Sequence, residues 1–211
     1  DIPPKLKELL NISYRENTSC VVNPKAEKET ERILGGNTTE RALLKFVKAD
    51  AEEFKIEGLE VLSEVMFNSA RKYSAARLKM GDGTEMSVVK GAAEKVLAQC
   101  NNYYDAEGNI QPLSEETKAS LSEQMDGKAD DGFRIIAAAT TEKSDLEEGL
   151  PDELSLVGFS LIRDEVREDS KPAIETLQGA GIHVVMLTGD RHGTAKAIAK
   201  DVGLITSDDD V

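Results

Sequence analysis

Residues 86–98 are the stretch that most constrains the fold of this chain. The β-branched pair Val88-Val89 leads directly into Lys90-Gly91. Beyond them, apolar residues recur at helical spacing: Ala93, Val96 and Leu97. The pattern predicts a strand that brings a lysine to a glycine hinge, with a helix beginning just beyond it. Such a junction offers an anion a positive side chain, a backbone without Cβ and the unpaired amides of a helix N-terminus. The alternative is that Lys90 is a solvated surface lysine and Gly91 only a helix entry.

The charge of the chain argues against two classes of partner. The net charge is −14, whereas nucleic acids and anionic membranes both select basic surfaces. Residues 67–95 depart from this average, with six basic and three acidic residues, so we expect an anionic ligand there. Cys20 and Cys100 are too few and too far apart for a disulfide framework or a metal site, and we expect reduced thiols in a cytosolic setting. We expect no metal ligands.

The first part of the chain is expected to form two helices joined by a loop. Pro4 precedes leucines at helical spacing, which predicts an N-terminal helix. Residues 23–36 are polar and end in two glycines, which favours a loop. A second helix is expected to begin at a cap within 37–39. Glu40 then lies in its first turn, where the helix dipole favours a carboxylate, and capping is one sufficient interpretation of this residue.

The middle of the chain is typical of β structure. Strands are expected within 59–90, where residues 76–80 alternate and 81–84 form a hairpin turn. Two further apolar strands are expected at 133–139 and 154–162. Before these two strands a polar helix is expected at 114–125, followed by an acidic loop from Gly127 to Gly132. Together these elements predict a sheet that is flanked by helices.

The composition changes after residue 163. A helix at 172–178, a strand at 183–187 and a helix at 195–202 are expected in succession. Thr188-Gly189-Asp190 would lie at the carboxyl end of that strand, where α/β folds bind phosphates. The order of strand, tight turn and helix predicts an α/β unit.

Six short motifs occur in order along the chain. They are Gly36-Asn37-Thr38-Thr39-Glu40, Phe67-Asn68-Ser69-Ala70-Arg71-Lys72, Lys90-Gly91-Ala92, Gly132-Phe133-Arg134, Asp164-Glu165-Val166-Arg167 and Thr188-Gly189-Asp190. Together they resemble the nucleotide-binding domain of P-type cation-transporting ATPases, continuing into the phosphorylation domain. The resemblance covers nearly the whole chain. Two positions depart from the family pattern, since Thr38 and Glu165 stand where the family usually has proline, and Glu165 loosens the interdomain hinge.

The resemblance implies a role for each matching residue. Phe67 would stack on adenine, Lys72 and Lys90-Gly91 would border the nucleotide, and Glu40 would support the adenine end. Arg134 would reach the phosphates when two domains close. The residues expected to face the transferred phosphoryl group are Thr188, Gly189 and Asp190, and those at the hinge are Asp164 and Arg167.

The resemblance also implies a fold and a division into domains. We expect an α+β chain in which residues 1–163 form an antiparallel sheet flanked by helices, the nucleotide-binding domain. Residues 164–211 would form part of a haloacid-dehalogenase-like phosphorylation domain. The strand at 183–187 would lack its neighbours, so we expect its edges to pair with a second copy in a homodimer or with an exchanged segment.

The implied parent is a calcium-pump-like ATPase that uses ATP and Mg²⁺. This chain would lie at the cytoplasmic face of a membrane, with the remaining phosphorylation, actuator and transmembrane domains as partners. Because the chain begins with Asp1, we expect it to be a piece of a longer polypeptide. Neither the phosphorylation motif D-K-T-G-T nor the magnesium motif G-D-G-x-N-D occurs, so we expect ATP binding without turnover and no catalytic residue in this piece.

Two other interpretations stay open. One is a free-standing haloacid-dehalogenase-like phosphatase, which would share the α/β unit that bears Asp190. That class needs a D-x-D nucleophile, and the acidic run at 208–210 follows no apolar strand. The other is a non-catalytic interaction module, in which the basic hairpin is only a solvated face. Nucleotide titration beside a phosphatase assay separates all three.

Overall fold

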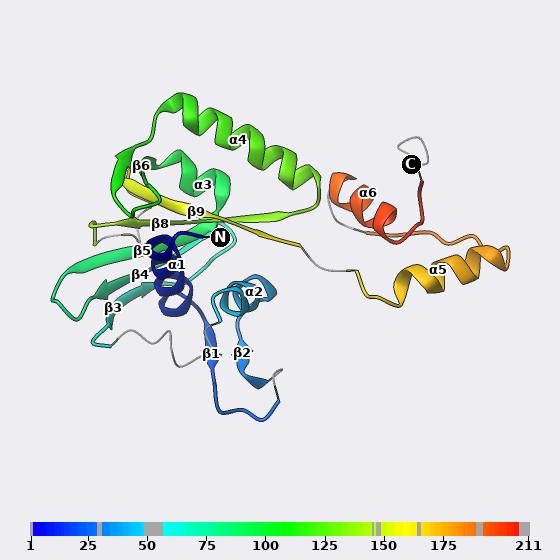
Figure 1. The fold of residues 1–211 in the computed structure, drawn as a ribbon, viewed down its shortest axis with the longest axis horizontal. Helices are drawn as coiled ribbons and strands as arrows, with labels where there is room; N and C mark the ends of the chain where they lie inside the picture. Colours follow the sequence, from blue (N-terminus) through cyan, green and yellow to red (C-terminus); the bar gives the residue numbers. More distant parts are fainter. Residues whose placement is uncertain are drawn as a thin grey trace. The chain divides into compact units, whose positions relative to one another are not determined.

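The computed structural model describes residues 2–206 apart from 29–30, 49–56, 145, 147–148, 164–165 and 189–191 (Figure 1). The described chain divides into two compact units. The first contains Asp1–Leu121 and Ile136–Ser160, and the second contains Ser122–Ile135 and Leu161–Val211. In the described residues, no helix is long and apolar enough to cross a membrane.

The larger sheet has seven strands in the order β3-β4-β5-β8-β9-β6-β7. Their bounds are β3 Glu60–Val65, β4 Tyr73–Lys79, β5 Glu85–Ala92, β6 Cys100–Tyr104, β7 Ile110–Pro112, β8 Arg134–Thr141 and β9 Leu154–Ile162. β3, β4, β5 and β8 pair antiparallel in that order, as do β6 and β7. The expected antiparallel pairing therefore holds for these strands, and the sheet is mixed because β6 pairs parallel with β9. A parallel pair needs a crossover between its strands, and the long connection from β6 to β9 supplies it.

Helix α1 (Pro4–Glu16) packs on the sheet and builds the core of the first unit. Ile12 of α1 clusters with Ala76 and Leu78 of β4 and Val88 of β5, all of them at most 2% exposed. Because side chains alternate across a strand, Lys90 lies on the same face of β5 as Val88. Helix α2 (Thr38–Phe46) contacts α1, and in Figure 1 α3 (Ala93–Ala98) lies on the other side of β8 and β9 from both. Strand alternation therefore places Lys90 on the face of the sheet against which α1 packs, called the α1 face below.

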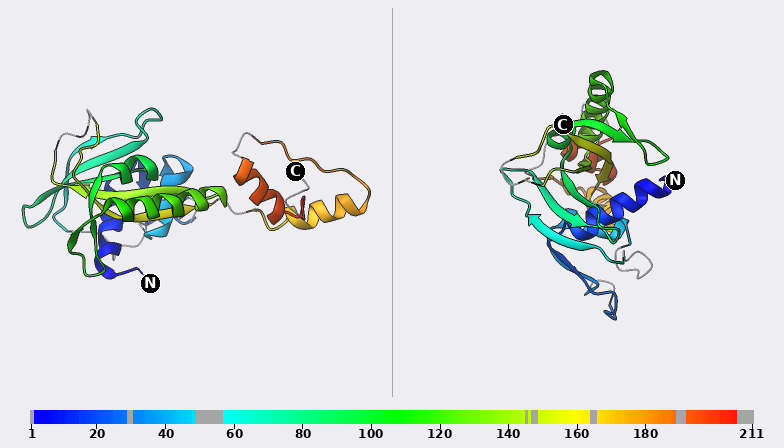
Figure 2. Two further views of the ribbon diagram at one scale, coloured as in Figure 1. Left: turned by 90° about the horizontal axis from the view of Figure 1, so that it is seen from above. Right: turned by 90° about the vertical axis from the view of Figure 1, so that its left-hand side faces the viewer.

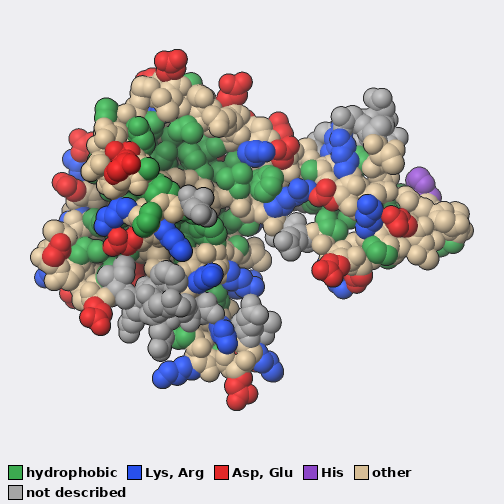
Figure 3. Space-filling view, in the orientation of Figure 1, with side chains coloured by type: hydrophobic (Ala, Val, Ile, Leu, Met, Phe, Trp, Pro, Cys, Tyr) green, Lys and Arg blue, Asp and Glu red, His purple; other side chains and the backbone are tan. Residues whose placement is uncertain are grey.

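A short antiparallel hairpin replaces part of the loop expected at 23–36. β1 (Cys20–Val22) pairs with β2 (Ile33–Gly35), and the hairpin projects from the first unit (Figure 2). Its charged side chains of both signs lie at the bottom of the view in Figure 3. With Val21 66% exposed and Leu34 48% exposed, the hairpin contains little buried apolar surface, which explains why hydrophobic periodicity did not predict it.

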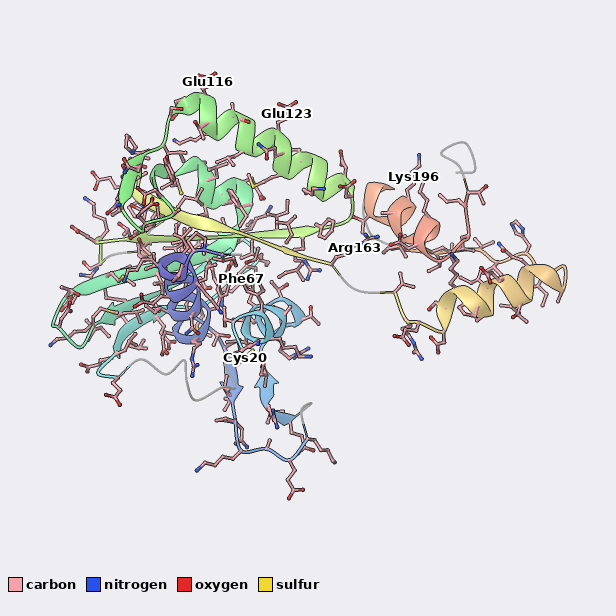
Figure 4. All side chains as sticks on the ribbon, in the orientation of Figure 1. Cys20, Phe67, Glu116, Glu123, Arg163 and Lys196 are labelled. Atoms are coloured by element: carbon pink, nitrogen blue, oxygen red, sulfur yellow. The ribbon has the colours of Figure 1, made fainter. Side chains whose placement is uncertain are left out.

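Helix α4 (Glu115–Asp130) is longer than expected. It continues through Gly127 to Asp130, so the acidic loop predicted from Gly127 is wrong. Glycine in a helix costs about 1 kcal/mol relative to alanine and does not by itself end the helix. Acidic side chains follow the outer edge of α4, where Figure 4 labels Glu116 and Glu123.

The second unit contains α5 (Ser170–Gly179) and α6 (His192–Asp201), close to the two helices expected there. The strand predicted at 183–187 is wrong, because the described segment 182–188 adopts no regular structure. Val185 is 65% exposed and Leu187 is 92% exposed. A strand needs a neighbour that accepts and donates its hydrogen bonds, and no strand of the described chain pairs with this segment.

Candidate nucleotide site

Glu40 closes a capping box with Asn37 at the start of α2. Asn37 Oδ1 accepts from the Glu40 amide at 2.9 Å, and Glu40 Oε2 accepts from the Asn37 amide at 3.3 Å. These reciprocal bonds satisfy backbone donors that a helix start leaves unpaired. The expected cap within 37–39 is therefore confirmed as Asn37, and capping is one real role of Glu40.

The carboxylate of Glu40 also has partners from outside its own helix. Ser19 donates to it twice, through its hydroxyl at 2.7 Å and its amide at 3.1 Å, and the Thr18 hydroxyl donates at 3.3 Å. The ammonium of Lys90 forms an ion pair with it at 3.4 Å. Glu40 is only 6% exposed, so this is a buried, hydrogen-bonded carboxylate rather than a solvated cap.

Lys90 is buried as deeply as Glu40, at 6% exposed. Its Nζ atom donates to the backbone carbonyl of Asn17 as well as to Glu40 Oε1. The alternative of a solvated surface lysine is therefore wrong. A buried ammonium requires such internal acceptors, because an unpaired buried charge is strongly unfavourable.

Burial and hydrogen bonding shift the pKa values of both groups. Burial raises the pKa of Glu40, but the bonds from Ser19 and Asn37 and the charge of Lys90 outweigh it, so the net pKa lies below its ordinary value of 4.5. Burial lowers the pKa of Lys90, and the carboxylate of Glu40 only partly opposes that shift. The carboxylate is thus ionised at neutral pH and able to hold its five donors.

Gly91 lies where two backbones come close. It pairs with Tyr73 of β4 and Ala137 of β8 as an ordinary strand residue, so the predicted glycine hinge is wrong. A Cβ at Gly91 would lie 2.6 Å from the carbonyl oxygen of Lys72 and 2.7 Å from Tyr73 Cβ. The same Lys72 carbonyl accepts from the Ala92 amide at 2.9 Å. The glycine is needed so that the backbone of Lys72 can reach the end of β5.

Phe67 and Lys72 flank a turn that Asn68 organises. The side chain of Asn68 accepts two amides of the turn at 2.8 and 3.1 Å, and its carbonyl accepts the Lys72 amide at 2.7 Å. Phe67 is 51% exposed, in the segment between β3 and β4 (Figure 4). Lys72 adopts φ +62°, and its ammonium lies 3.5 Å from the Glu94 carboxylate at the surface. The turn therefore presents an aromatic ring and a cation to solvent.

Arg134 belongs to the second unit, where a cation–π cluster fixes its neighbour. The ring of Phe133 has Lys128 Nζ at 6.0 Å and the Arg163 guanidinium at 5.6 Å from its centroid. Arg163 also forms an ion pair with Asp201 of α6. These contacts hold the start of β8, from which the exposed Arg134 projects.

The remaining predicted residues lie in the second unit. Thr188 is exposed, and Arg167 forms a two-point pair with Asp169 at 3.1 and 3.2 Å. Three predicted residues lie outside the described part of the chain, and their roles stay predictions: Asp164, Gly189 and Asp190.

Contacts link four of the predicted residues of the first unit, namely Glu40, Lys72, Lys90 and Gly91. Glu40 pairs with Lys90, Lys90 precedes Gly91, and Gly91 meets the backbone of Lys72. Sequence reasoning missed Asn17 and Ser19, which hold the buried pair. Short polar side chains after a helix commonly bond to nearby backbone, so their types alone did not point to partners at positions 40 and 90.

The comparison with protein families decides the assignment. The model of the P-type ATPase cytoplasmic domain N matches residues 5–169. The chain belongs to the P-type ATPase family. The matched residues begin within α1 and include every strand of the seven-stranded sheet.

Individual relatives of this N domain have names that agree with the family. The chain is 35% identical over its whole length to a putative calcium-transporting ATPase 13, plasma membrane-type, of Arabidopsis thaliana. It is 35% identical over 92% of its length to a probable calcium-transporting ATPase 9 of Oryza sativa, and 34% identical over 97% to the calcium-transporting ATPase PAT1 of Dictyostelium discoideum. The matches cover 21%, 19% and 19% of these relatives, so the chain spans about a fifth of their length.

Proposed function

We propose that this N domain binds ATP within a P-type ATPase that moves calcium across a membrane. It would present the γ-phosphate to a phospho-accepting aspartate that this sequence does not contain. The family match and the names of the relatives support the proposal. The other parts of the pump, namely the rest of the phosphorylation domain, the actuator domain and the transmembrane domain, are the proposed partners.

One observation carries the proposal. The Gly91 contact ties the backbone of Lys72 to β5, so the turn that exposes Phe67 is anchored beside the strand that carries Lys90. An exposed aromatic ring next to cations suits a ligand with a flat base and a phosphate chain. We assign stacking on adenine to Phe67, a place beside the nucleotide and its phosphate charge to Lys72 and Lys90, and support of the adenine end to Glu40.

The second unit would complete the site during turnover. Arg134 would reach the phosphates, and Thr188, Gly189 and Asp190 would face the transferred phosphoryl group. Mg²⁺ would accompany ATP in the parent protein. In the described residues, no group of three or more His, Cys, Asp and Glu side chains is arranged to hold a metal ion.

Phe67 gives the sharpest test of nucleotide binding. Phe67→Ala is expected to weaken ATP binding by about tenfold, the loss of one base–aromatic stack. Phe46→Ala is the matched control, because Phe46 of α2 is equally exposed, at 54% against 51%, and is assigned no role. Calorimetric titration measures both. Equal affinity of the two variants for ATP would contradict the proposal.

A homodimer of the isolated chain through segment 182–188 is also proposed. The exposed Val185 and Leu187 support it, because an extended apolar segment can pair with a second copy. Sizing with light scattering is expected to give a dimer whose mass falls on dilution, and a chain ending at residue 162 is expected to be monomeric. A full chain that is monomeric at every concentration would overturn this part.

A further inference from the structure

The turn between α1 and β1 holds both members of the Glu40–Lys90 pair. Ser19 contacts both oxygens of the Glu40 carboxylate, with its hydroxyl on Oε2 and its amide on Oε1. The carbonyl of Asn17 accepts from the Lys90 ammonium. A turn of three residues therefore contacts two charged groups that the proposed function places at the nucleotide.

We propose that Asn17 and Ser19 are positioning residues of the nucleotide site. Ser19 sets the orientation of the Glu40 carboxylate, and Asn17 sets the position of the Lys90 ammonium, so that the pair presents one geometry to a bound adenine nucleotide. The inference rests on the proposed function, since it assigns to these residues the task of preparing that site.

Ser19 controls the carboxylate more strongly than the capping box does. Within the capping box, the carboxylate of Glu40 is held only through Oε2, at 3.3 Å from the Asn37 amide, whereas the Ser19 hydroxyl lies 2.7 Å from the same oxygen. Hydrogen bonds to an ionised group are short and strong, and two donors on different oxygens fix the plane of the carboxylate. Without the bonds from Ser19, Glu40 would stay in the first turn of α2, but its carboxylate would lose this orientation.

Asn17 anchors the turn to the strands beneath it. Its side-chain amide donates to the carbonyls of Ser74 in β4 and Val88 in β5, at 3.1 and 3.5 Å, and the residue is 3% exposed. Val88 lies two residues before Lys90 on the same face of β5. The bond to Val88 therefore ties the acceptor carbonyl to the strand that carries Lys90, which matters because a lysine side chain has a long and flexible stem.

The test compares Ser19→Ala with Ser19→Thr, which keeps a hydroxyl, and with Ser122→Ala, a control at an exposed serine of α4. Carbon-13 NMR of the Glu40 carboxyl gives its titration without nucleotide, and calorimetry gives the Kd for ATP. Ser19→Ala is expected to raise the pKa of Glu40 and to weaken ATP binding by about tenfold, the loss of one charge-assisted hydrogen bond. Ser19→Thr is expected to restore both, and Ser122→Ala to change neither.

The outcomes separate this inference from the proposed function. Suppose that the unaltered chain binds ATP and that Ser19→Ala has the same Glu40 titration and the same Kd for ATP. The positioning role is then wrong, and the proposed function stands. A loss in Ser19→Ala that Ser19→Thr does not restore would also overturn it, because packing rather than the hydroxyl would be the cause. If the unaltered chain fails to bind ATP while Ser19→Ala still shifts the Glu40 titration, the proposed function falls and the hold of Ser19 on Glu40 stands.

A variant of Asn17 checks the second half of the inference. Asn17→Ala removes both side-chain bonds of the anchor and is expected to change the ammonium resonance of Lys90 and to weaken ATP binding several-fold. The Glu40 titration of Ser19→Ala keeps the test valid if Asn17→Ala fails to fold. A folded Asn17→Ala chain with an unchanged Lys90 resonance and unchanged ATP affinity would exclude Asn17.

Discussion

The Lys90 ammonium lies 3.4 Å from the Glu40 carboxylate, although fifty residues separate the two in sequence. Each is 6% exposed, and each comes from a different part of the fold, one from a central strand and the other from the first turn of a helix. Side-chain alternation along β5 places Lys90 on the α1 face of the sheet. The capping box fixes the position of Glu40, which pairs with Lys90 there. The pair thus follows from strand alternation in β5 and from helix capping at the start of α2, two segments that are distant in sequence.

Removal of Lys90 is expected to destabilise the first unit strongly. Lys90→Met leaves the buried Glu40 carboxylate without its counter-charge, and breaking a buried pair from one side typically costs about 3 kcal/mol. Lys95→Met is the matched control, because Lys95 is exposed on α3. Urea unfolding measures the free energies. A Lys90→Met protein as stable as Lys95→Met would contradict the buried ion pair.

The pH dependence of stability is expected to reveal the depressed pKa of Glu40. Because the folded-state pKa lies below 4.5, the unfolded chain binds more protons as pH falls, and the stabilisation by the Glu40 carboxylate is lost through that range. The stability difference between the unaltered chain and Glu40→Gln should therefore be constant above about pH 6 and shrink below pH 4.5. Glu116→Gln, at an exposed position of α4, is the control for the loss of one carboxylate. If the stability difference between the unaltered chain and Glu40→Gln grows as the pH falls, the pKa of Glu40 is not lowered on folding.

Two glycine-to-alanine changes are expected to have opposite effects. Gly91→Ala would place a Cβ 2.6 Å from the Lys72 carbonyl, and such overpacking is expected to cost about 1–3 kcal/mol. Gly127→Ala meets no atom within 4 Å inside α4 and is expected to stabilise by up to about 1 kcal/mol. Thermal unfolding compares them. Equal effects of the two changes would refute the close approach at Gly91.

Much of the first unit could be predicted from sequence because its elements follow simple periodicities. The strand that contains Val88 was predictable for this reason, and residue types placed the cap of the second helix within 37–39. The hairpin of β1 and β2 was not, because it buries little apolar surface. The strand expected at 183–187 fails for a different reason, since local sequence favours an extended chain but a strand also needs a neighbour. Motifs alone predicted the candidate site residues, but no periodic pattern connects the Glu40–Lys90 pair to Asn17 and Ser19, which contact it.

The isolated chain is expected to bind ATP without forming a phosphoenzyme. The motif D-K-T-G-T, which carries the phospho-accepting aspartate of the family, does not occur in the sequence. Incubation with γ-labelled ATP and magnesium, followed by acid precipitation, should leave no label on the protein. Acid-stable label that survives repurification would contradict the proposed role and favour a free-standing phosphatase.

Chemical-shift mapping with ATP tests the central claim most directly, because it reports binding and its location together. We expect affinity near the millimolar range, about −4 kcal/mol, since one domain holds only one side of the nucleotide. The account predicts that the amides of Phe67, Lys72 and Gly91 shift in a saturable way, while those of Glu116 and Ser122 on α4 stay in place. Shifts confined to residues outside the turn at 67–72 and the end of β5, or no saturable shift at all, would contradict it.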